Sequence, residues 1–147
     1  MIQSNFGPGN LEVVARVGNR LAHFFRDHEA PFTWHGPVFF EEGVAGNPVL
    51  IQSNFGKNGN FELVTPLSTG GLGHFARDND APGFPWSGPT RFGTDLGMVD
   101  AVGLIQSNIG PGNLEVIARV GTALRQFMRD HMPPFARHVT PAPGVGL

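Results

Sequence analysis

The sequence contains no cysteine and no tyrosine, and only 15% of its 147 residues are charged. The absence of cysteine excludes a disulfide, a thiolate nucleophile and a cysteine-ligated metal, and it leaves the redox compartment open. A charged fraction this low is unusual for a solvated surface, so we expect much of the surface to be buried between copies.

Positive charge is scarce as well, because the sequence has only 10 lysine and arginine residues and a formal net charge of −2. This balance offers no basic stripe to a phosphate backbone, and we expect no nucleic-acid partner. No apolar run approaches the roughly 20 residues of a membrane helix, so we expect no membrane insertion. Met1 leads directly into a repeated segment, which predicts a soluble chain without a signal peptide, either cytoplasmic or released.

The sequence does contain 21 glycines, 13 prolines and 13 phenylalanines, and one of its segments occurs three times. The glycines and prolines indicate frequent turns and argue against long helices. The repeated segment, Ile-Gln-Ser-Asn, starts at Ile2, Ile51 and Ile105, and each copy precedes a glycine-rich turn, an apolar run and an Arg-Asp pair. A repeat of about 50 residues built from β-type segments has the size of one propeller blade.

Each repeated unit is predicted to form about four antiparallel strands. The chain is treated as a single repeat domain, 1–147, with units 2–50, 51–104 and 105–147. In the first unit we expect strands at Ile2–Asn5, Leu11–Val17, Arg20–Asp27 and Phe32–Phe40, separated by turns. In the third unit Arg137 stands where the other units have tryptophan, and whether this unit completes its own fourth strand stays open.

The pattern as a whole predicts an all-β fold of three β-propeller blades. Three blades are too few for a closed ring, because propellers contain about four to eight. We favour a homodimer that closes a six-bladed ring, since closure removes exposed apolar faces and strand edges. The chain stops in phase with its repeat at Leu147, so the alternatives are a head-to-tail filament and a piece of a longer chain.

The Arg-Asp pair recurs once in each unit, as Arg26-Asp27, Arg77-Asp78 and Arg129-Asp130. Arginine and aspartate can hold the hydroxyl groups of a sugar by charge-assisted hydrogen bonds, and Asn79 and Asp80 make the second cluster the most polar. The alternative is a repeated ion pair or turn-capping aspartate, which is favoured because a repeat also duplicates its structural residues.

Two further repeated features have both a functional and a structural interpretation. Trp34 and Trp86 precede Gly-Pro, and each could be a stacking platform for a sugar or could pack between units. The Gln-Ser-Asn segments could line a channel, but we favour a role in satisfying backbone groups between units.

Catalytic and metal-binding patterns are missing. His23 and His74 are equivalent, but the third unit has Gln126 there, and no histidines have a zinc-like spacing. Glu12, Glu62 and Glu115 align one per unit instead of forming the close carboxylate pair of a glycosidase. No nucleophile motif surrounds the serines of the repeat. We therefore predict no enzyme activity, no cofactor and no metal, and a hydrolase remains the least supported hypothesis.

Three segments carry a family resemblance: Gly-Asn-Leu-Glu-Val-Val-Ala-Arg-Val-Gly (9–18), Leu-Ala-His-Phe-Phe-Arg-Asp (21–27) and Trp-His-Gly-Pro (34–37). They resemble the lectin-type β-propellers, including tachylectin-like and tectonin-like repeats, and the resemblance extends over all three units. It implies sugar binding in pockets between adjacent blades, without catalysis. This chain departs from the family in having only three units and in lacking the third tryptophan.

The leading prediction is a multivalent carbohydrate-binding module whose partners are glycans and a second copy of itself. The alternative is a structural self-assembling repeat protein, natural or designed, without a small ligand. The candidate ligand-binding residues are Arg26, Asp27, Trp34, Arg77, Asp78, Asn79, Asp80, Trp86, Arg129 and Asp130.

Overall fold

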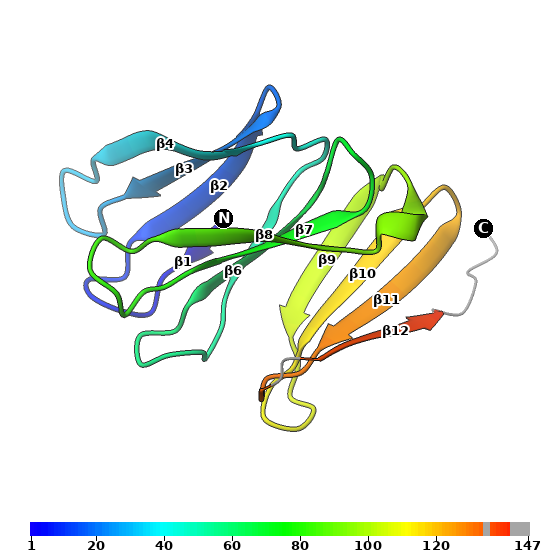
Figure 1. Ribbon diagram of the computed structural model, residues 1–147. Coiled ribbons are helices and arrows are strands. Elements are labelled where there is room, and N and C mark those ends of the chain that lie inside the picture. Colours follow the sequence, from blue (N-terminus) through cyan, green and yellow to red (C-terminus); the bar gives the residue numbers. More distant parts are fainter. Residues whose placement is uncertain (134–135, 142–147) are drawn as a thin grey trace.

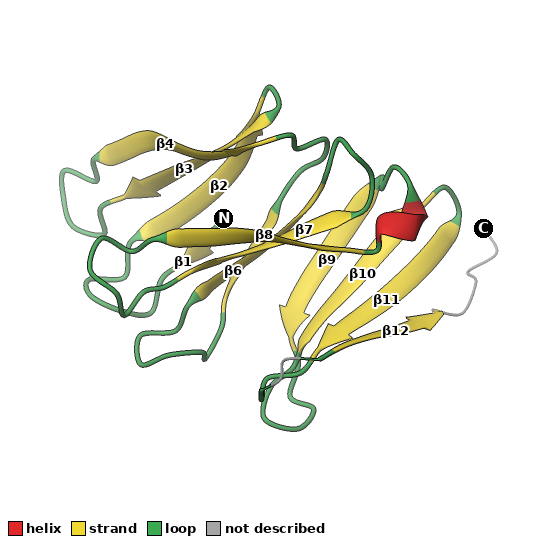
Figure 2. Cartoon of the chain, viewed as in Figure 1, coloured by secondary structure: helices red, strands yellow, loops and turns green. Residues whose placement is uncertain are grey.

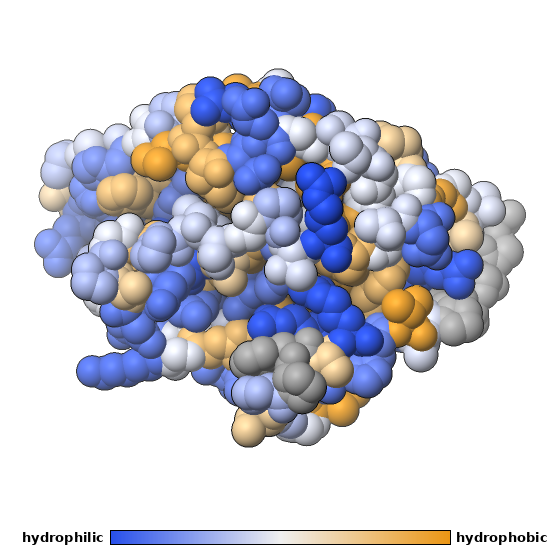
Figure 3. All heavy atoms as spheres, viewed as in Figure 1, coloured by the Kyte–Doolittle hydropathy of each residue, from blue (hydrophilic) through white to orange (hydrophobic). Residues whose placement is uncertain are grey.

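The computed structural model describes residues 1–133 and 136–141, and these form three four-stranded antiparallel sheets (Figures 1 and 2). Each sheet is a meander in which the strands follow one another in chain order. The predicted all-β class and the four antiparallel strands of each unit are therefore confirmed. In the described part of the chain, no helix is long and apolar enough to cross a membrane. Hydrophilic and hydrophobic residues are interspersed over the face of the molecule in Figure 3.

The three sheets are numbered along the chain. Sheet 1 consists of β1 (Ile2–Gln3), β2 (Leu11–Val17), β3 (Arg20–Arg26) and β4 (Trp34–Glu42). Sheet 2 consists of β5 (Val49–Gln52), β6 (Phe61–Pro66), β7 (Leu72–Arg77) and β8 (Trp86–Phe92). A short 3-10 turn, η1 (Thr94–Leu96), leads to sheet 3, which consists of β9 (Ala101–Gln106), β10 (Leu114–Val120), β11 (Ala123–Arg129) and β12 (Arg137–Pro141).

The third unit completes its own fourth strand. Arg137 begins β12 opposite Arg129, just as Trp86 begins β8 opposite Arg77. The first strands of sheets 2 and 3 begin earlier than the repeated segment, at Val49 and Ala101. They do so because the residues before the segment continue to pair with the second strand of their own sheet.

The fourth strands β4 and β8 lie at sheet edges, where proline is tolerated because it has no backbone N–H to donate. The register of both strands shifts opposite the third strand, near Gly36 and Gly88. These glycines have φ of 107° and 121°, and a Cβ there would lie 2.7 Å from the carbonyl oxygen of His23 or His74. Only glycine fits this close approach.

Sheet 2 lies between sheets 1 and 3, and the first strands of neighbouring sheets lie closest together (Figure 1). One core fills the interface between sheets 1 and 2, and it includes Leu21, Phe61, Leu63 and Phe75. A second core fills the interface between sheets 2 and 3, and it includes Val64, Leu72, Val116 and Phe127. The two cores lie on opposite faces of sheet 2.

The burial of the second strands reflects this order. Every residue of β6 is buried, because sheet 2 is covered on both faces. In β2 the buried residues are Glu12 and Val14, which point toward sheet 2. In β10 the buried residues are Leu114, Val116 and Ala118, which point toward sheet 2. The repeat places these residues on the face that is less buried in β2. Each terminal sheet therefore has one face that no described residue of the chain covers.

A repeated hydrogen bond joins neighbouring sheets at their first strands. The backbone N–H of Asn5 donates to Oε1 of Gln52 at 2.8 Å, and that of Asn54 donates to Oε1 of Gln106 at 2.8 Å. Inside its own sheet each glutamine donates to a carbonyl of the following glycine-rich turn. The prediction that the Gln-Ser-Asn segments satisfy backbone groups between units is confirmed for these two interfaces.

Candidate ligand-binding grooves

A glutamate of the second strand is paired with a side chain of the third strand in each sheet, and this glutamate is buried in sheets 1 and 2 and partly buried in sheet 3. Nε2 of His23 lies 2.7 Å from Oε2 of Glu12, and Nε2 of His74 lies 2.6 Å from Oε2 of Glu62. In sheet 3 Nε2 of Gln126 donates to Oε2 of Glu115 at 2.7 Å. Buried carboxylates need such partners, because an unpaired one would be strongly destabilising.

Arg77 extends from sheet 2 to the buried pair of sheet 1. Its Nη1 lies 3.6 Å from Oε2 of Glu12 and 3.4 Å from Nε2 of His23. Its guanidinium lies over the ring of Phe61, 4.4 Å from the centroid, and its Nε donates to Oδ1 of Asn79 at 2.8 Å. Burial lowers the pKa of the Arg77 guanidinium, and the Glu12 carboxylate opposes this effect. The interface between sheets 1 and 2 therefore contains two buried groups of opposite charge, the Glu12 carboxylate and the Arg77 guanidinium.

The Glu12–His23–Arg77 cluster forms the polar part of an open groove between sheets 1 and 2. The groove has a volume of about 290 Å³. Aromatic side chains from both sheets line it, namely Phe6, Phe25, Phe84 and Trp86. Polar and aromatic groups thus share one concave surface of the size that binds a small molecule.

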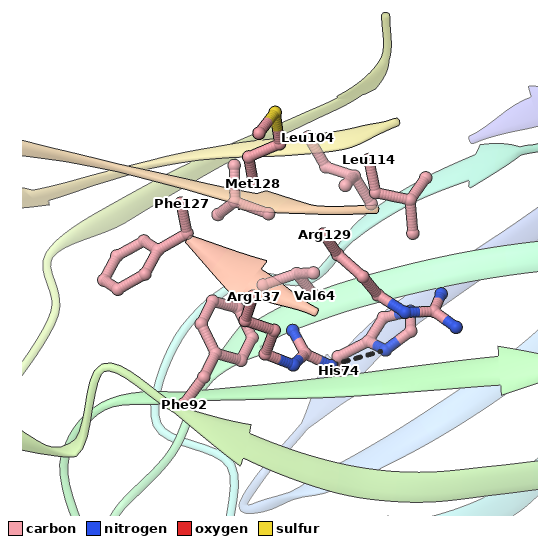
Figure 4. A pocket seen from close by; sticks show the side chains of 10 residues that line it. Val64, His74, Phe92, Leu104, Leu114, Phe127, Met128, Arg129 and Arg137 are labelled. Carbon is pink, nitrogen blue, oxygen red and sulfur yellow. Dashed lines mark hydrogen bonds between the residues drawn. The ribbon is translucent and has the colours of Figure 1, made fainter. Parts of the chain in front are cut away.

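The corresponding groove between sheets 2 and 3 is more polar. It has a volume of about 270 Å³, and His74, Arg129 and Arg137 lie along it. Figure 4 shows both arginines extending from sheet 3 toward His74, with the ring of Phe92 beside Arg137. Nη2 of Arg137 lies 3.4 Å from Nδ1 of His74. Burial lowers the pKa of Arg137, the charge of Arg129 lowers it further, and Glu62 opposes both.

The two members of each predicted Arg-Asp pair have separate contacts. Arg77 and Arg129 lie in the grooves, and Arg26 lies half-buried on the uncovered face of sheet 1, over the ring of Phe32. The aspartates bond to other groups, as Asp27 does with Nε2 of His35 at 2.9 Å. Asp130 is likewise 3.1 Å from Nε2 of His138, while Asp78 accepts the backbone N–H groups of Asp80 and Ala81.

Asn79 and Asp80 hold the turns of sheet 2 together. The buried side chain of Asn79 donates to the carbonyl of Gly59 at 2.7 Å and accepts from Arg77. The carboxylate of Asp80 accepts the backbone N–H groups of Lys57 and Asn58 at 2.6 and 2.9 Å. Both residues stabilise the loop that follows the groove-facing Arg77 at the end of β7.

The two tryptophans have different surroundings. Trp86 is half-buried between sheets 1 and 2, and its ring stacks on Phe40 of sheet 1 at 4.5 Å and an angle of 6°. Its Nε1 is buried and has no hydrogen-bond partner among the described residues. Trp34 occupies the equivalent position on the uncovered face of sheet 1, where it is 53% exposed.

The pairing of each glutamate with a third-strand residue was missed at the sequence level. The Gly18-Asn19 turn could have revealed it, because a two-residue turn fixes Val17 opposite Arg20. Glu12 and His23 then lie on the same face of the sheet as diagonal neighbours. Across the three units these positions hold Glu-His, Glu-His and Glu-Gln, which keeps a hydrogen-bond donor beside the carboxylate each time.

The described residues include no group of three or more histidine and carboxylate side chains arranged to hold a metal ion. No protein-family model, curated protein or solved structure matches the chain. Its function is therefore inferred from the grooves themselves.

Proposed function

We propose that this protein binds carbohydrates in the grooves between its sheets. The observation that carries the proposal is the groove between sheets 1 and 2, where Phe84 and Trp86 lie beside the buried Glu12–His23–Arg77 cluster. A pyranose has an apolar C–H face that packs on an aromatic ring, and hydroxyl groups that bond to charged side chains. The groove offers both kinds of contact within a volume of about 290 Å³.

The second groove has a different ligand preference in this proposal. Arg137 stands where the groove between sheets 1 and 2 has Trp86, so this groove contains one more arginine than its counterpart. A groove with excess positive charge favours a sugar with a carboxylate or sulfate group. We therefore expect neutral sugars between sheets 1 and 2 and acidic sugars between sheets 2 and 3.

The arrangement of the sheets supports a propeller as the scaffold for these sites. Neighbouring sheets lie closest at their first strands, as blades do around a central axis. We propose that the three sheets are blades and that a second copy of the chain completes a six-bladed ring. Several weak sites on one ring would then act together on a branched or clustered glycan.

A glycan array followed by calorimetric titration of the best neutral and acidic ligands tests the proposal. The informative variant is Phe84→Ala. Phe84 is 47% exposed, and it lines the groove between sheets 1 and 2 but not the groove between sheets 2 and 3. Loss of one aromatic contact should weaken neutral-sugar binding about tenfold. Binding of the acidic sugar should be unchanged.

Met98→Ala is the matched control, since Met98 is 56% exposed and lies in the segment between η1 and β9, away from both grooves. It should leave both affinities unchanged. An array without any bound glycan would overturn the proposal. So would a neutral-sugar affinity that Phe84→Ala does not alter. Either outcome would favour the second candidate, a self-assembling repeat protein without a small ligand.

A further inference from the structure

We infer that the uncovered faces of sheets 1 and 3 are two halves of one interface, which a second copy of this chain joins. Sheet 3 of each copy would pack on sheet 1 of the other, so that two equal interfaces close the ring. The inference rests on the proposed ring and not on the proposed ligand. It follows from the two interfaces already present inside one chain.

The uncovered face of sheet 3 carries the residues that sheets 1 and 2 bury against their successors. Ile117 corresponds to Val14 and Val64, which are 7% and 1% exposed, yet Ile117 itself is 39% exposed. Ile105, which corresponds to Ile51, is 58% exposed, whereas Ile51 packs against the core between sheets 2 and 3. This face is built as the first half of an inter-sheet interface.

The uncovered face of sheet 1 supplies the second half. Its residues Leu11, Arg26 and Trp34 correspond in sheet 2 to Phe61, Arg77 and Trp86, all of which face sheet 1. In sheet 2 these residues are covered by the preceding sheet, sheet 1. In sheet 1 no described residue of the same chain covers them.

Polar groups on the two faces are complementary. By analogy with Arg77 and Glu12, which are 3.6 Å apart, Arg26 of one copy would reach Glu115 of the other. The backbone N–H of Asn108 would donate to Oε1 of Gln3, as Asn5 donates to Gln52 and Asn54 to Gln106 within one chain. The charge pair and the hydrogen bond fix both the partner and the register.

The joined faces also create a groove that neither copy has alone. One copy would contribute the hydrogen-bonded Glu115 and Gln126, and the other would contribute Arg26 and the exposed rings of Phe32 and Trp34. These five residues correspond to the part of the groove between sheets 1 and 2 that is formed by Glu12, His23, Arg77, Phe84 and Trp86, with a glutamine in place of the histidine. The composite groove is therefore a further site of the neutral-sugar type, and it is incomplete without the second copy.

Light-scattering mass measurements on charge-reversed variants test the interface. Wild type should have twice the mass of one chain. Arg26→Glu and Glu115→Arg should each raise the dissociation constant of the dimer at least about a hundredfold, because like charges then face each other in both interfaces. Mixing the two variants should restore the dimer, since each interface regains a pair of opposite charges.

The control is Lys57→Glu, which makes the same charge change as Arg26→Glu but on an exposed turn of sheet 2, and it should leave the dimer intact. Circular dichroism should show that all variants keep the β-sheet fold. A monomeric wild type, an unchanged mass in both variants or a mixture that stays monomeric would overturn the inference. An open-ended series of masses would overturn the closed ring. Monomeric variants should still bind sugar in the grooves within one chain, so failure of the interface and failure of the ligand proposal are distinguishable.

Discussion

Nη1 of Arg77 and Oε2 of Glu12 lie 3.6 Å apart across the interface between sheets 1 and 2, although the two residues are far apart in the sequence. Both side chains are buried, and His23 is bonded to the same carboxylate oxygen. Because both residues also line the adjacent groove, a change at either one affects both the stability of the interface and the shape of the groove.

Replacing Arg77 with lysine should destabilise the protein even though the charge is kept. Lysine loses the Nε bond to Asn79 and the planar contact with Phe61, so we expect a decrease of about 1–3 kcal/mol in the free energy of unfolding. Arg91→Lys is the control, because Arg91 is exposed and bonds to Thr69, and it should change stability by no more than about 0.5 kcal/mol. Urea unfolding at one fixed protein concentration measures both, and equal effects would contradict the prediction.

His74 should be replaceable by glutamine but not by alanine. Glutamine already fills the equivalent position in sheet 3, where Gln126 donates to Glu115. His74→Gln should therefore cost less than about 1 kcal/mol, whereas His74→Ala leaves Glu62 buried without this partner and should cost about 2–3 kcal/mol. Thermal unfolding should show the difference as about 2–4 °C per kcal/mol. A glutamine variant as unstable as the alanine variant would refute the equivalence of the pairs.

Gly88→Ala should be far more disruptive than Gly83→Ala. Both glycines have positive φ, but a Cβ at Gly88 would meet the backbone oxygen of His74 at 2.7 Å, while a Cβ at Gly83 has nothing within 4 Å. We expect a cost above about 3 kcal/mol for Gly88→Ala, and about 1 kcal/mol of backbone strain for Gly83→Ala. Chemical denaturation of the two variants measures this difference. Similar midpoints would show that the backbone relaxes easily at the register shift between β7 and β8.

Trp86→Phe should be tolerated or even stabilising. Phenylalanine keeps the stack on Phe40 and removes a buried Nε1 that has no partner among the described residues. Trp86→Ala should instead cost about 3–5 kcal/mol, because it leaves a cavity between sheets 1 and 2. Unfolding followed by circular dichroism compares the three proteins without depending on tryptophan fluorescence. A strongly destabilised phenylalanine variant would indicate that Nε1 contributes a contact to the fold.

The sequence predicted local structure more closely than the contacts between sheets. The alternation of apolar and polar residues in 11–17 predicts β2, and the Gly18-Asn19 turn predicts where β3 begins. Both features depend only on residues that are close together in the sequence. The start of β9 at Ala101 could not be predicted in this way, because it depends on pairing with Arg119. The contact of Arg77 with Glu12 depends on how two sheets are oriented, which no spacing in the sequence specifies.

At the candidate site too, the sequence predicted local features better than the direction in which each side chain points. The repeated Arg-Asp pairs drew attention to Arg77 and Arg129, which do lie in the grooves. Their neighbours Asp78 and Asp130 point away from the grooves, because successive side chains along a strand lie on opposite faces of the sheet. Asp78 bonds within its own loop, and Asp130 bonds to His138 on β12. Whether a side chain at a strand end faces a groove or a turn depends on tertiary packing, which a repeat does not reveal.

The hydrogen bond that Asn of one sheet donates to Gln of the next has a consequence for how this protein could change in length. The bond is the same at both interfaces within the chain, and it involves only the repeated segment of each unit. A duplicated unit inserted between two others would therefore find a matching donor before it and a matching acceptor after it. Gain or loss of whole units would keep every remaining junction intact, whereas a deletion inside a unit would break two junctions at once.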